Sequence, residues 1–546
     1  MEPHVPGALV SMPSAGGPRR LLPCAAALVG LLLVAGLPAI PAAGDEGARV
    51  PVIVLARSGR LDEAAQRVVD AGGVLVRRLS ILDEVTARIP ATSLAALVAD
   101  PSVAAVERDR PLHLLGSDDP ALTAGAGTDL GLVARITGAD EVWKDGITGR
   151  GVDVALIDSG VSPVAGLDDP GALVDGPDLS LDLQSGAPAW RDTFGHGTHL
   201  AGIIAGRGAD GLRDAGSGVA PGARIVNVKV AGAGGQVDVS QVIAAIDWVV
   251  QHRSDGDLHI RVLALAFGTD GGRDYRTDPL ARAVEVAWQH GIVVVVSAGN
   301  GGSAGLTDPA VDPFVIAVGA DDPRGTERSD DDLVPAWSSR GDGVRNPDLV
   351  APGVSIRSLR VPGSSLDAAV PAAPQDPGRI SGSGTSQAAA VVAGAVALLL
   401  DARPGLTPDQ VKALIVGSAD QLPGQRSTTA GAGLLDVEGA LEARAPAATQ
   451  AWVPSTGAGP LEGARGSTHL AIDGVALTGE QDVFGAPWNG AAWVETSSAA
   501  RAWQGGDWNG NPWAGTCWCA ASATGLSWSG LSWSGLSWST VDWAPR

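Results

Sequence analysis

The chain has 546 residues, which is long enough for two or three domains and for a core of enzyme size. Its formal net charge is −22 and it contains no run of basic residues, so nucleic acid is excluded as a partner. Aromatic residues are scarce before residue 488, and Ala, Val, Leu and Ile must therefore build most of the core. Such a composition suits a parallel sheet covered by helices.

Residues 1–43 have the features of a signal peptide. A pair of arginines precedes an apolar stretch at 21–37, and small residues follow it. A membrane anchor is the alternative, but the stretch is short for a membrane span and Pro23 interrupts it. We therefore predict a secreted, extracellular protein that can stay associated with the cell surface. Only two cysteines would remain after removal of the signal, so no disulfide framework holds the rest of the chain.

Residues 44–127 are predicted to form a small α+β unit and a linker. Strand patterns and amphipathic helix patterns alternate in the ferredoxin-like order β-α-β-β-α-β, at 51–56, 61–71, 74–76, 85–89, 92–99 and 102–106. The stretch 116–127 is rich in Gly, Ala and Asp and is typical of a cleavable linker.

Residues 128–443 alternate apolar runs with helical stretches. Four runs read as buried parallel strands, at 152–157, 224–230, 260–266 and 292–297. Helices at 239–252 and 279–290 supply crossovers between them. The pattern predicts an α/β fold with a doubly wound, mostly parallel sheet and helices on both faces, whose ligand site lies at the carboxyl ends of the strands.

Three short blocks carry residues for nucleophilic catalysis. Asp158 directly follows a strand pattern, and His196 lies between two glycines at the start of an apolar helix. Ser386 opens the most apolar helical stretch, at 387–400. A serine, a histidine that accepts its proton and a buried carboxylate that orients the histidine form the triad of serine hydrolases. Taken singly, the aspartate also fits a turn and the serine also fits a helix N-cap.

The blocks Asp158-Ser-Gly, His196-Gly-Thr-His and Gly-Thr-Ser386 together resemble the catalytic signatures of the subtilase family of serine endopeptidases. The order Asp, His, Ser along the chain is the subtilisin order. The resemblance implies a subtilisin-like fold with these residues as the triad, and Asn300 as a side-chain donor to the oxyanion. It also implies that the unit at 44–127 is an inhibitory propeptide that the enzyme cuts away; a retained accessory domain is the alternative.

The resemblance further implies a substrate-binding edge strand and a wall of the primary specificity pocket. The edge would be Leu263, Ala264, Leu265 and Ala266, and the wall Ser297, Ala298 and Gly299. None of these residues is charged, so we expect a preference for large apolar or aromatic side chains. The chain departs from the family pattern at Gln387, where the family usually has Met, and this affects the pocket beside the nucleophile.

No cofactor is required for this chemistry, and the predicted partners are protein or peptide substrates and the chain's own propeptide. Calcium is common in the family, and an acidic stretch offers five carboxylates, Asp168, Asp169, Asp175, Asp178 and Asp182. Their spacing matches no known ion loop, so no metal ligand is assigned and a solvated acidic loop is the alternative.

Residues 444–546 form a C-terminal extension with five-residue Trp repeats. Ten tryptophans share one register, at Trp488, Trp493, Trp503, Trp508, Trp513, Trp518, Trp528, Trp533, Trp538 and Trp543. Neither a strand nor a helix places all ten rings on one side, whereas a coil with five residues per edge would. Rows of aromatic rings can stack on sugars, so a cell wall or polysaccharide is a predicted partner. A surface-binding protein on a protease-fold scaffold is the alternative function, and a structural cap is a third interpretation of the repeats.

Overall fold

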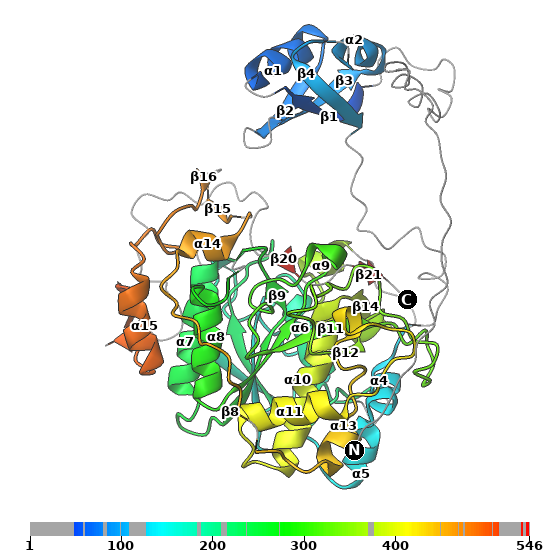
Figure 1. Ribbon diagram of the computed structural model, residues 1–546, viewed down its shortest axis with the longest axis vertical. Helices are drawn as coiled ribbons and strands as arrows, with labels where there is room; N and C mark the ends of the chain where they lie inside the picture. Colours follow the sequence, from blue (N-terminus) through cyan, green and yellow to red (C-terminus); the bar gives the residue numbers. More distant parts are fainter. Residues whose placement is uncertain are drawn as a thin grey trace, which may run out of the picture. The chain divides into compact units, whose positions relative to one another are not determined.

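The computed structural model describes residues 49–108, 127–512, 537–538 and 542–544, with short gaps at 58–59, 80–83, 99, 183–186, 209–215, 236, 272–273, 370–375, 448, 468, 473–474 and 505. The chain divides into two compact units, 1–112 and 113–546 (Figure 1). The predicted signal peptide lies outside the described residues, as does the predicted linker except for Gly127.

The first unit is a four-stranded antiparallel sheet with two helices. Its strands lie in the order β2-β3-β1-β4, with bounds β1 (Arg49–Ala56), β2 (Val74–Leu79), β3 (Glu84–Pro90) and β4 (Val103–Arg108). The helices are α1 (Leu61–Asp70) and α2 (Leu94–Val98), the second preceded by the 3-10 turn η1 (Ala91–Ser93). The valines and isoleucines that alternate along β1 and β3 are buried against them. The predicted ferredoxin-like order is confirmed.

The second unit is built on a seven-stranded sheet in which every pairing is parallel. The order is β12-β11-β10-β8-β5-β7-β6, with bounds β5 (Asp153–Asp158), β6 (Leu173–Asp178), β7 (Arg224–Lys229), β8 (Ile260–Leu265), β10 (Val293–Ser297), β11 (Ile316–Asp321) and β12 (Leu349–Pro352). The four predicted strands form its centre. Because helices cover both faces, these strands are almost continuously apolar and buried.

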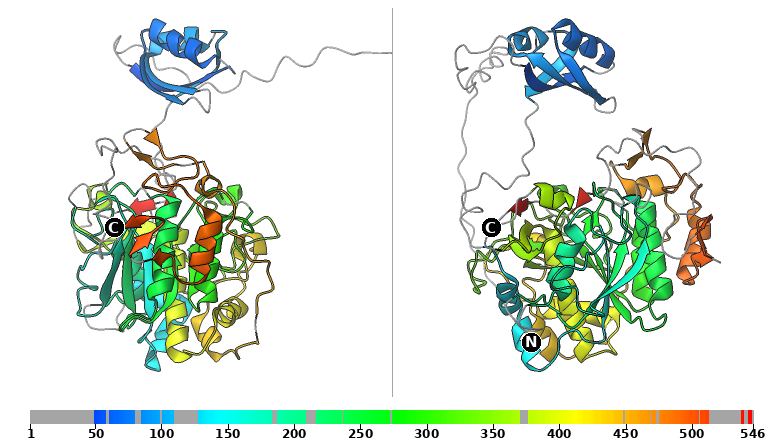
Figure 2. Two further views of the ribbon diagram at one scale, coloured as in Figure 1. Left: turned by 90° about the vertical axis from the view of Figure 1, so that its left-hand side faces the viewer. Right: turned by 180° about the vertical axis from the view of Figure 1, so that it is seen from behind.

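Four long helices sandwich this sheet (Figures 1 and 2). On one face lie α6 (His196–Ala205) and α10 (Thr385–Ala402), and on the other α7 (Val239–His252) and α8 (Pro279–Gln289). Among the described residues only α10 is long and apolar enough to cross a membrane, but 89% of it is buried inside the protein, as befits a central core helix. The predicted doubly wound, mostly parallel sheet with helices on both faces is confirmed.

The remaining described elements lie around this core. The helices are α4 (Leu130–Thr137), α5 (Ala139–Lys144), α9 (Ser365–Ala369), α11 (Pro408–Ser418), α12 (Ser427–Ala430), α13 (Val437–Glu442), α14 (Leu461–Arg465), α15 (Gly490–Ser498) and the 3-10 turn η3 (Gly302–Ala304). The strands are β9 (Phe267–Gly268), β13 (Ile356–Leu359), β14 (Arg379–Ser383), β15 (Ala471–Ile472), β16 (Val475–Ala476), β17 (Trp503–Gln504), β18 (Asp507–Trp508), β19 (Asn511–Pro512), β20 (Ser537–Trp538) and β21 (Asp542–Ala544).

The direction of winding reverses beside β5. After β5 the chain fills one side of the sheet with β6 and β7, and it then crosses to β8 and continues outward on the other side. In open α/β sheets the crevice at such a reversal, beyond the carboxyl ends of the strands, is where ligands bind. The fold therefore places a site at the ends of β5 and β8.

The C-terminal extension packs on the same core as the sheet. Trp488, Trp493, Trp503 and Trp508 are at most 7% exposed and belong to the main hydrophobic cluster. Residues 488–512 fold into loops, α15 and the small sheet β17-β18-β19, so a uniform five-residue coil is wrong for this part of the repeat. We call residues 451–512 the C-terminal arm.

Candidate active site

Asp158 and His196 meet at the carboxyl end of β5. Asp158 is the last residue of β5 and His196 the first of α6, and both side chains are fully buried. The imidazole Nδ1 lies 2.9 and 3.0 Å from the two carboxylate oxygens of Asp158. This contact favours one tautomer of the neutral ring, with the proton on Nδ1 and none on Nε2.

Small and polar neighbours allow this close approach. A Cβ atom on Gly197 would lie 2.2 Å from the carbonyl oxygen of Gly160, so only glycine fits after the histidine. Asp192, which the sequence analysis missed, ties the two elements together. It accepts from Ser159 Oγ at 2.8 Å and from the backbone N–H of Thr198 at 2.8 Å. No sequence block marked Asp192, because its role depends on contacts between separate loops.

His199 is excluded as the base. It is fully buried on α6, and burial, with a contribution from nearby His196, lowers its pKa to about 3. The ring is therefore neutral at every pH at which a protease of this kind would work, and it cannot cycle between charged and neutral forms. Of the two histidines of the pair, His196 is the one that contacts Asp158.

Ser386 lies in the first turn of α10. Its hydroxyl is buried and donates to the carbonyl oxygen of Ala266, just beyond the end of β8, at 2.8 Å. The long, largely apolar and buried helix α10 holds this position in the core. The free N–H groups and the positive end of the helix dipole lie beside the hydroxyl, where negative charge would be stabilised.

Asn300 faces α10 from the loop after β10. Its Oδ1 accepts from the backbone N–H and the hydroxyl of Thr385, both at 3.0 Å. Because a backbone N–H can only donate, the amide oxygen must face Thr385 and the NH₂ group must point away. Asn300 Nδ2 is buried and has no hydrogen-bond acceptor. The amide thus presents an unused donor, as an oxyanion site requires.

Thr385 is a second residue that sequence reasoning missed. Besides orienting Asn300, its Oγ1 accepts from the backbone N–H of Gly299 at 3.1 Å. Its place directly before Ser386, inside the block Gly-Thr-Ser386, was the available signal, but no separate role was assigned to it.

The predicted substrate-binding edge requires a correction. Leu263, Ala264 and Leu265 lie inside β8, which is paired with β5 on one side and β10 on the other. Both sides of this backbone are used, so these residues cannot pair with a peptide. Ala266 lies just outside β8, and the edge continues instead as β9 (Phe267–Gly268).

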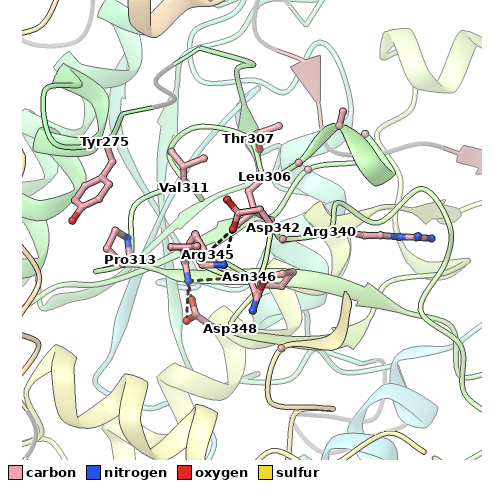
Figure 3. A pocket seen from close by; sticks show the side chains of 18 of the residues that line it. Tyr275, Leu306, Thr307, Val311, Pro313, Arg340, Asp342, Arg345, Asn346 and Asp348 are labelled. Atoms are coloured by element: carbon pink, nitrogen blue, oxygen red, sulfur yellow. Dashed lines mark hydrogen bonds and ion pairs between the residues drawn. The ribbon is translucent and has the colours of Figure 1, made fainter. Parts of the chain in front are cut away.

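The predicted wall, Ser297, Ala298 and Gly299, ends β10 and runs to Asn300. A cavity of about 1550 Å³ opens beside it, and Gly299 and Asn300 are among its lining residues. Figure 3 shows apolar groups, such as Leu306 and Val311, on one part of the lining and charged groups on another. Arg345 forms a two-point ion pair with Asp348, at 3.0 and 3.1 Å. The cavity thus carries charged groups beyond the named wall residues, and the preference for large apolar side chains stays a prediction.

The five acidic residues considered for calcium have separate partners. Asp175 and Asp178 belong to β6 and not to a loop. The contacts are Asp168 with Gly166 N, Asp169 with Arg207, Asp175 with Asn227, Asp178 with Ser180 and Asp182 with Lys229. Within the described part of the chain no group of three His, Cys, Asp or Glu residues could hold a metal ion. These five carboxylates therefore give no calcium ligand set.

Comparisons with known proteins agree with this geometry. The model of the subtilase family matches residues 149–439. The serine protease AprX of Bacillus subtilis (strain 168) is 39% identical over 310 residues, which cover 55% of this chain and 69% of AprX. Subtilisin E of the same strain is 31% identical over 383 residues, covering 68% and 84% of the two chains.

A crystal structure of a cold adapted subtilisin-like serine proteinase is 30% identical, with a TM-score of 0.40, and the match covers 53% of this chain and 90% of that one. The family match spans more than half of the chain and includes the ends of β5, β10 and the start of α10. The chain belongs to the subtilase family of serine proteases.

Proposed function

We propose that this protease is a secreted endopeptidase, made as a self-processing zymogen, in which Ser386 is the nucleophile. His196 is the general base and Asp158 the residue that orients it. Asn300 donates to the oxyanion. The substrates are proteins or peptides bound in extended form beside Ser386.

The proposed reaction assigns one step to each of these groups. Ser386 Oγ attacks the scissile carbonyl carbon, and its proton passes to Nε2 of His196. The carbonyl oxygen becomes an oxyanion, which accepts hydrogen bonds from Asn300 Nδ2 and the backbone N–H of Ser386. The tetrahedral intermediate collapses, the C–N bond breaks, and His196 gives its proton to the leaving amine. Water then hydrolyses the acyl-enzyme by the same steps, with His196 again the base.

One observation carries the proposal: the unused, buried NH₂ group of Asn300 beside the first turn of α10. A buried donor without an acceptor costs free energy, about 1–3 kcal/mol. An oxyanion that forms only in the transition state would offset that cost and would be stabilised in preference to the substrate.

The test is Ser386→Ala. Loss of the nucleophile should reduce kcat by about 2 × 10⁶, the value known for subtilisin itself and carried over from the family. Exposed Ser254→Ala is the matched control and should keep full activity. A serine-directed phosphonate should label the wild type and the control but not Ser386→Ala. More than about a tenth of wild-type activity in Ser386→Ala would contradict the assignment.

The zymogen part of the proposal concerns the unit at 49–108. It is a compact unit of its own, joined to the protease by a stretch of linker composition, which supports a role as a removable inhibitor. Secreted wild type should begin between about residues 116 and 128, whereas secreted Ser386→Ala should keep the whole unit. N-terminal sequencing distinguishes the two, and identical processing of both would exclude self-cleavage. The same measurement on the Ser386→Ala protein tests removal of the signal peptide at 1–43.

Binding to a cell wall or polysaccharide is proposed only for the Trp repeats beyond residue 512. The four repeat tryptophans at 488, 493, 503 and 508 are buried and offer no face for stacking on sugars. A chain ending at Pro512 keeps the arm and removes the later repeats. It should retain protease activity but lose retention on cell-wall fragments, and equal retention would refute the binding role.

A further inference from the structure

Two short strands from the C-terminal end of the chain pair with backbone edges on either side of Ser386. β20 pairs antiparallel with β9, with Ser537 opposite Gly268 and Trp538 opposite Phe267. β21 pairs antiparallel with β14, with Asp542 opposite Ser383. Figure 1 shows both strands in red beside their partners.

Both edges adjoin the proposed nucleophile. The carbonyl of Ala266, which directly precedes β9, accepts the hydrogen bond from Ser386 Oγ at 2.8 Å. Ser383 ends β14 and lies three residues before Ser386. The chain runs from Trp538 to Asp542 in four residue steps, which can span at most about 14 Å. The facing ends of β20 and β21 are therefore no more than about 14 Å apart, at two edges that both adjoin Ser386.

This is the path that a bound peptide must follow. An extended peptide gains affinity by adding a strand to an exposed sheet edge, through main-chain hydrogen bonds. Since β9 and β14 both adjoin Ser386, an extended peptide whose carbonyl reaches Ser386 would pair with these edges. β20 and β21 each pair antiparallel with one of these edges. A substrate therefore cannot pair with the same edges at the same time.

We propose that β20 and β21, residues 537–538 and 542–544, are an intramolecular ligand of the substrate cleft and compete with peptide substrates. The inference rests on the proposed function, since it takes Ser386 as the reacting centre. A tethered segment has an effective concentration of the order of millimolar, so even weak pairing would keep the cleft largely filled. Competition of this kind raises the apparent KM and leaves kcat unchanged.

The repeat in this region provides a matched control. The Ser-Trp pair of β20 recurs five residues earlier, at Ser532 and Trp533. Proline at a paired position removes a backbone N–H and disrupts the ladder. We therefore compare Ser537→Pro/Trp538→Pro with Ser532→Pro/Trp533→Pro, and add a chain that ends at Leu536.

The experiment measures KM and kcat on a short peptide substrate, with active sites titrated by the phosphonate and masses measured before assay. The 537/538 variant and the shortened chain should have an apparent KM at least threefold lower than the wild type, with kcat unchanged, and the 532/533 variant should match the wild type. A synthetic peptide of residues 535–546 should inhibit the shortened chain competitively.

The remaining outcomes separate the two hypotheses. Loss of the C-terminal residues in active enzyme but not in Ser386→Ala would also support binding in the cleft, because only a bound segment is cut. Equal KM values for intact enzymes, with no inhibition by the peptide, would overturn the inference while leaving the proposed function in place. Failure of the phosphonate to label any variant would instead refute the proposed function.

Discussion

In the proposed oxyanion site, Asn300 and Thr385 act as a pair from two different elements. The loop after β10 supplies the donor, and the start of α10 supplies the two groups that hold its oxygen. A donor that is oriented before the reaction needs no reorganisation when charge develops, which is why such sites are effective. We therefore expect Asn300 to contact the reacting atoms and Thr385 to position Asn300.

Asn300→Ala should lower kcat by about 10²–10³ with little change in KM. The magnitude is that known for the equivalent donor in subtilisin, and the reason is that the hydrogen bond forms with the transition state and not with the substrate. Steady-state kinetics on a peptide substrate measures both constants. A rise in KM without a fall in kcat would mean that Asn300 binds the substrate instead.

Thr385→Val should have a smaller effect of the same kind. It removes the hydroxyl that donates to Asn300 Oδ1 and leaves the backbone N–H in place, so we expect a roughly tenfold fall in kcat, about 1.4 kcal/mol. Thr385→Ser keeps the hydroxyl and should restore activity. If Ser at this position is as impaired as Val, the packing of the methyl group and not the hydrogen bond is responsible.

At the scale of single residues, the sequence predicted those site residues that lie in recognisable sequence motifs. Asp158 and His196 were identified from local patterns, and the structure brings them together. Asp192 and Thr385 were missed because their importance lies in hydrogen bonds between loops far apart in the chain, which no local pattern reports.

Among the elements, the contact of the C-terminal arm with α7 departs most from expectation. Asp247 of α7 is fully buried and accepts from the indole N–H of Trp493 at 2.7 Å and of Trp508 at 2.9 Å. Ser497 Oγ also donates to it. Burial raises the pKa of Asp247 to about 6, and the three donors favour its ionised form. The arm is thus anchored by polar contacts inside an apolar interface.

Trp508→Phe should lower the free energy of unfolding by about 1–3 kcal/mol, because it keeps most of the apolar bulk but removes one donor to a buried carboxylate. Urea unfolding in a Ser386→Ala background, which prevents self-digestion, measures the change. Trp452→Phe, at a position 53% exposed, is the control and should change stability by less than about 0.5 kcal/mol. Equal stability of both variants would mean that the arm is not anchored through Asp247.

Helices and strands could be predicted where the apolar residues of the sequence follow a single pattern. The buried strands and the crossover helices α7 and α8 were expected within a residue or so of their observed bounds. The division between β8 and β9 was not expected, because the apolar run continues through Phe267 while the backbone leaves the parallel sheet after Leu265. The burial of the arm was missed because tryptophans at a five-residue spacing match neither a helix nor a strand, so their packing depends on the surface of α7 and α8.

At the scale of the whole molecule, a group of buried carboxyl groups links stability to pH. Burial raises the pKa of Asp278 to about 6, of Glu285 to about 7 and of Asp312 to about 8, and raises that of Asp308 as well. Unfolding returns these groups to their ordinary values near 4. Between about pH 4 and pH 8 the folded protein therefore holds more protons than the unfolded chain, and the free energy of unfolding must fall as pH rises.

Asp312→Asn should make the free energy of unfolding fall less steeply as pH rises. Asp312 Oδ1 accepts from the backbone N–H of Phe314 at 2.8 Å, which an amide oxygen can also do, and its Oδ2 is buried without a partner. After burial, Glu285 raises the pKa of Asp312, while Arg345 and Lys412 lower it. Removing one titrating proton should reduce the slope of unfolding free energy against pH by up to about 1.4 kcal/mol per unit between pH 4 and pH 8.

Urea unfolding across this range, in the Ser386→Ala background, measures the slope for each protein. Asp255→Asn, at an exposed position, is the control and should keep the wild-type slope. The measurement stays below pH 8, because burial lowers the pKa of Lys412 to about 8, so above that pH the unfolded chain holds its proton more tightly and stability changes in the opposite direction. If Asp312→Asn and wild type lose stability at the same rate from pH 4 to pH 8, Asp312 is already ionised in the folded protein, and the loss of stability must come from the other buried carboxyl groups.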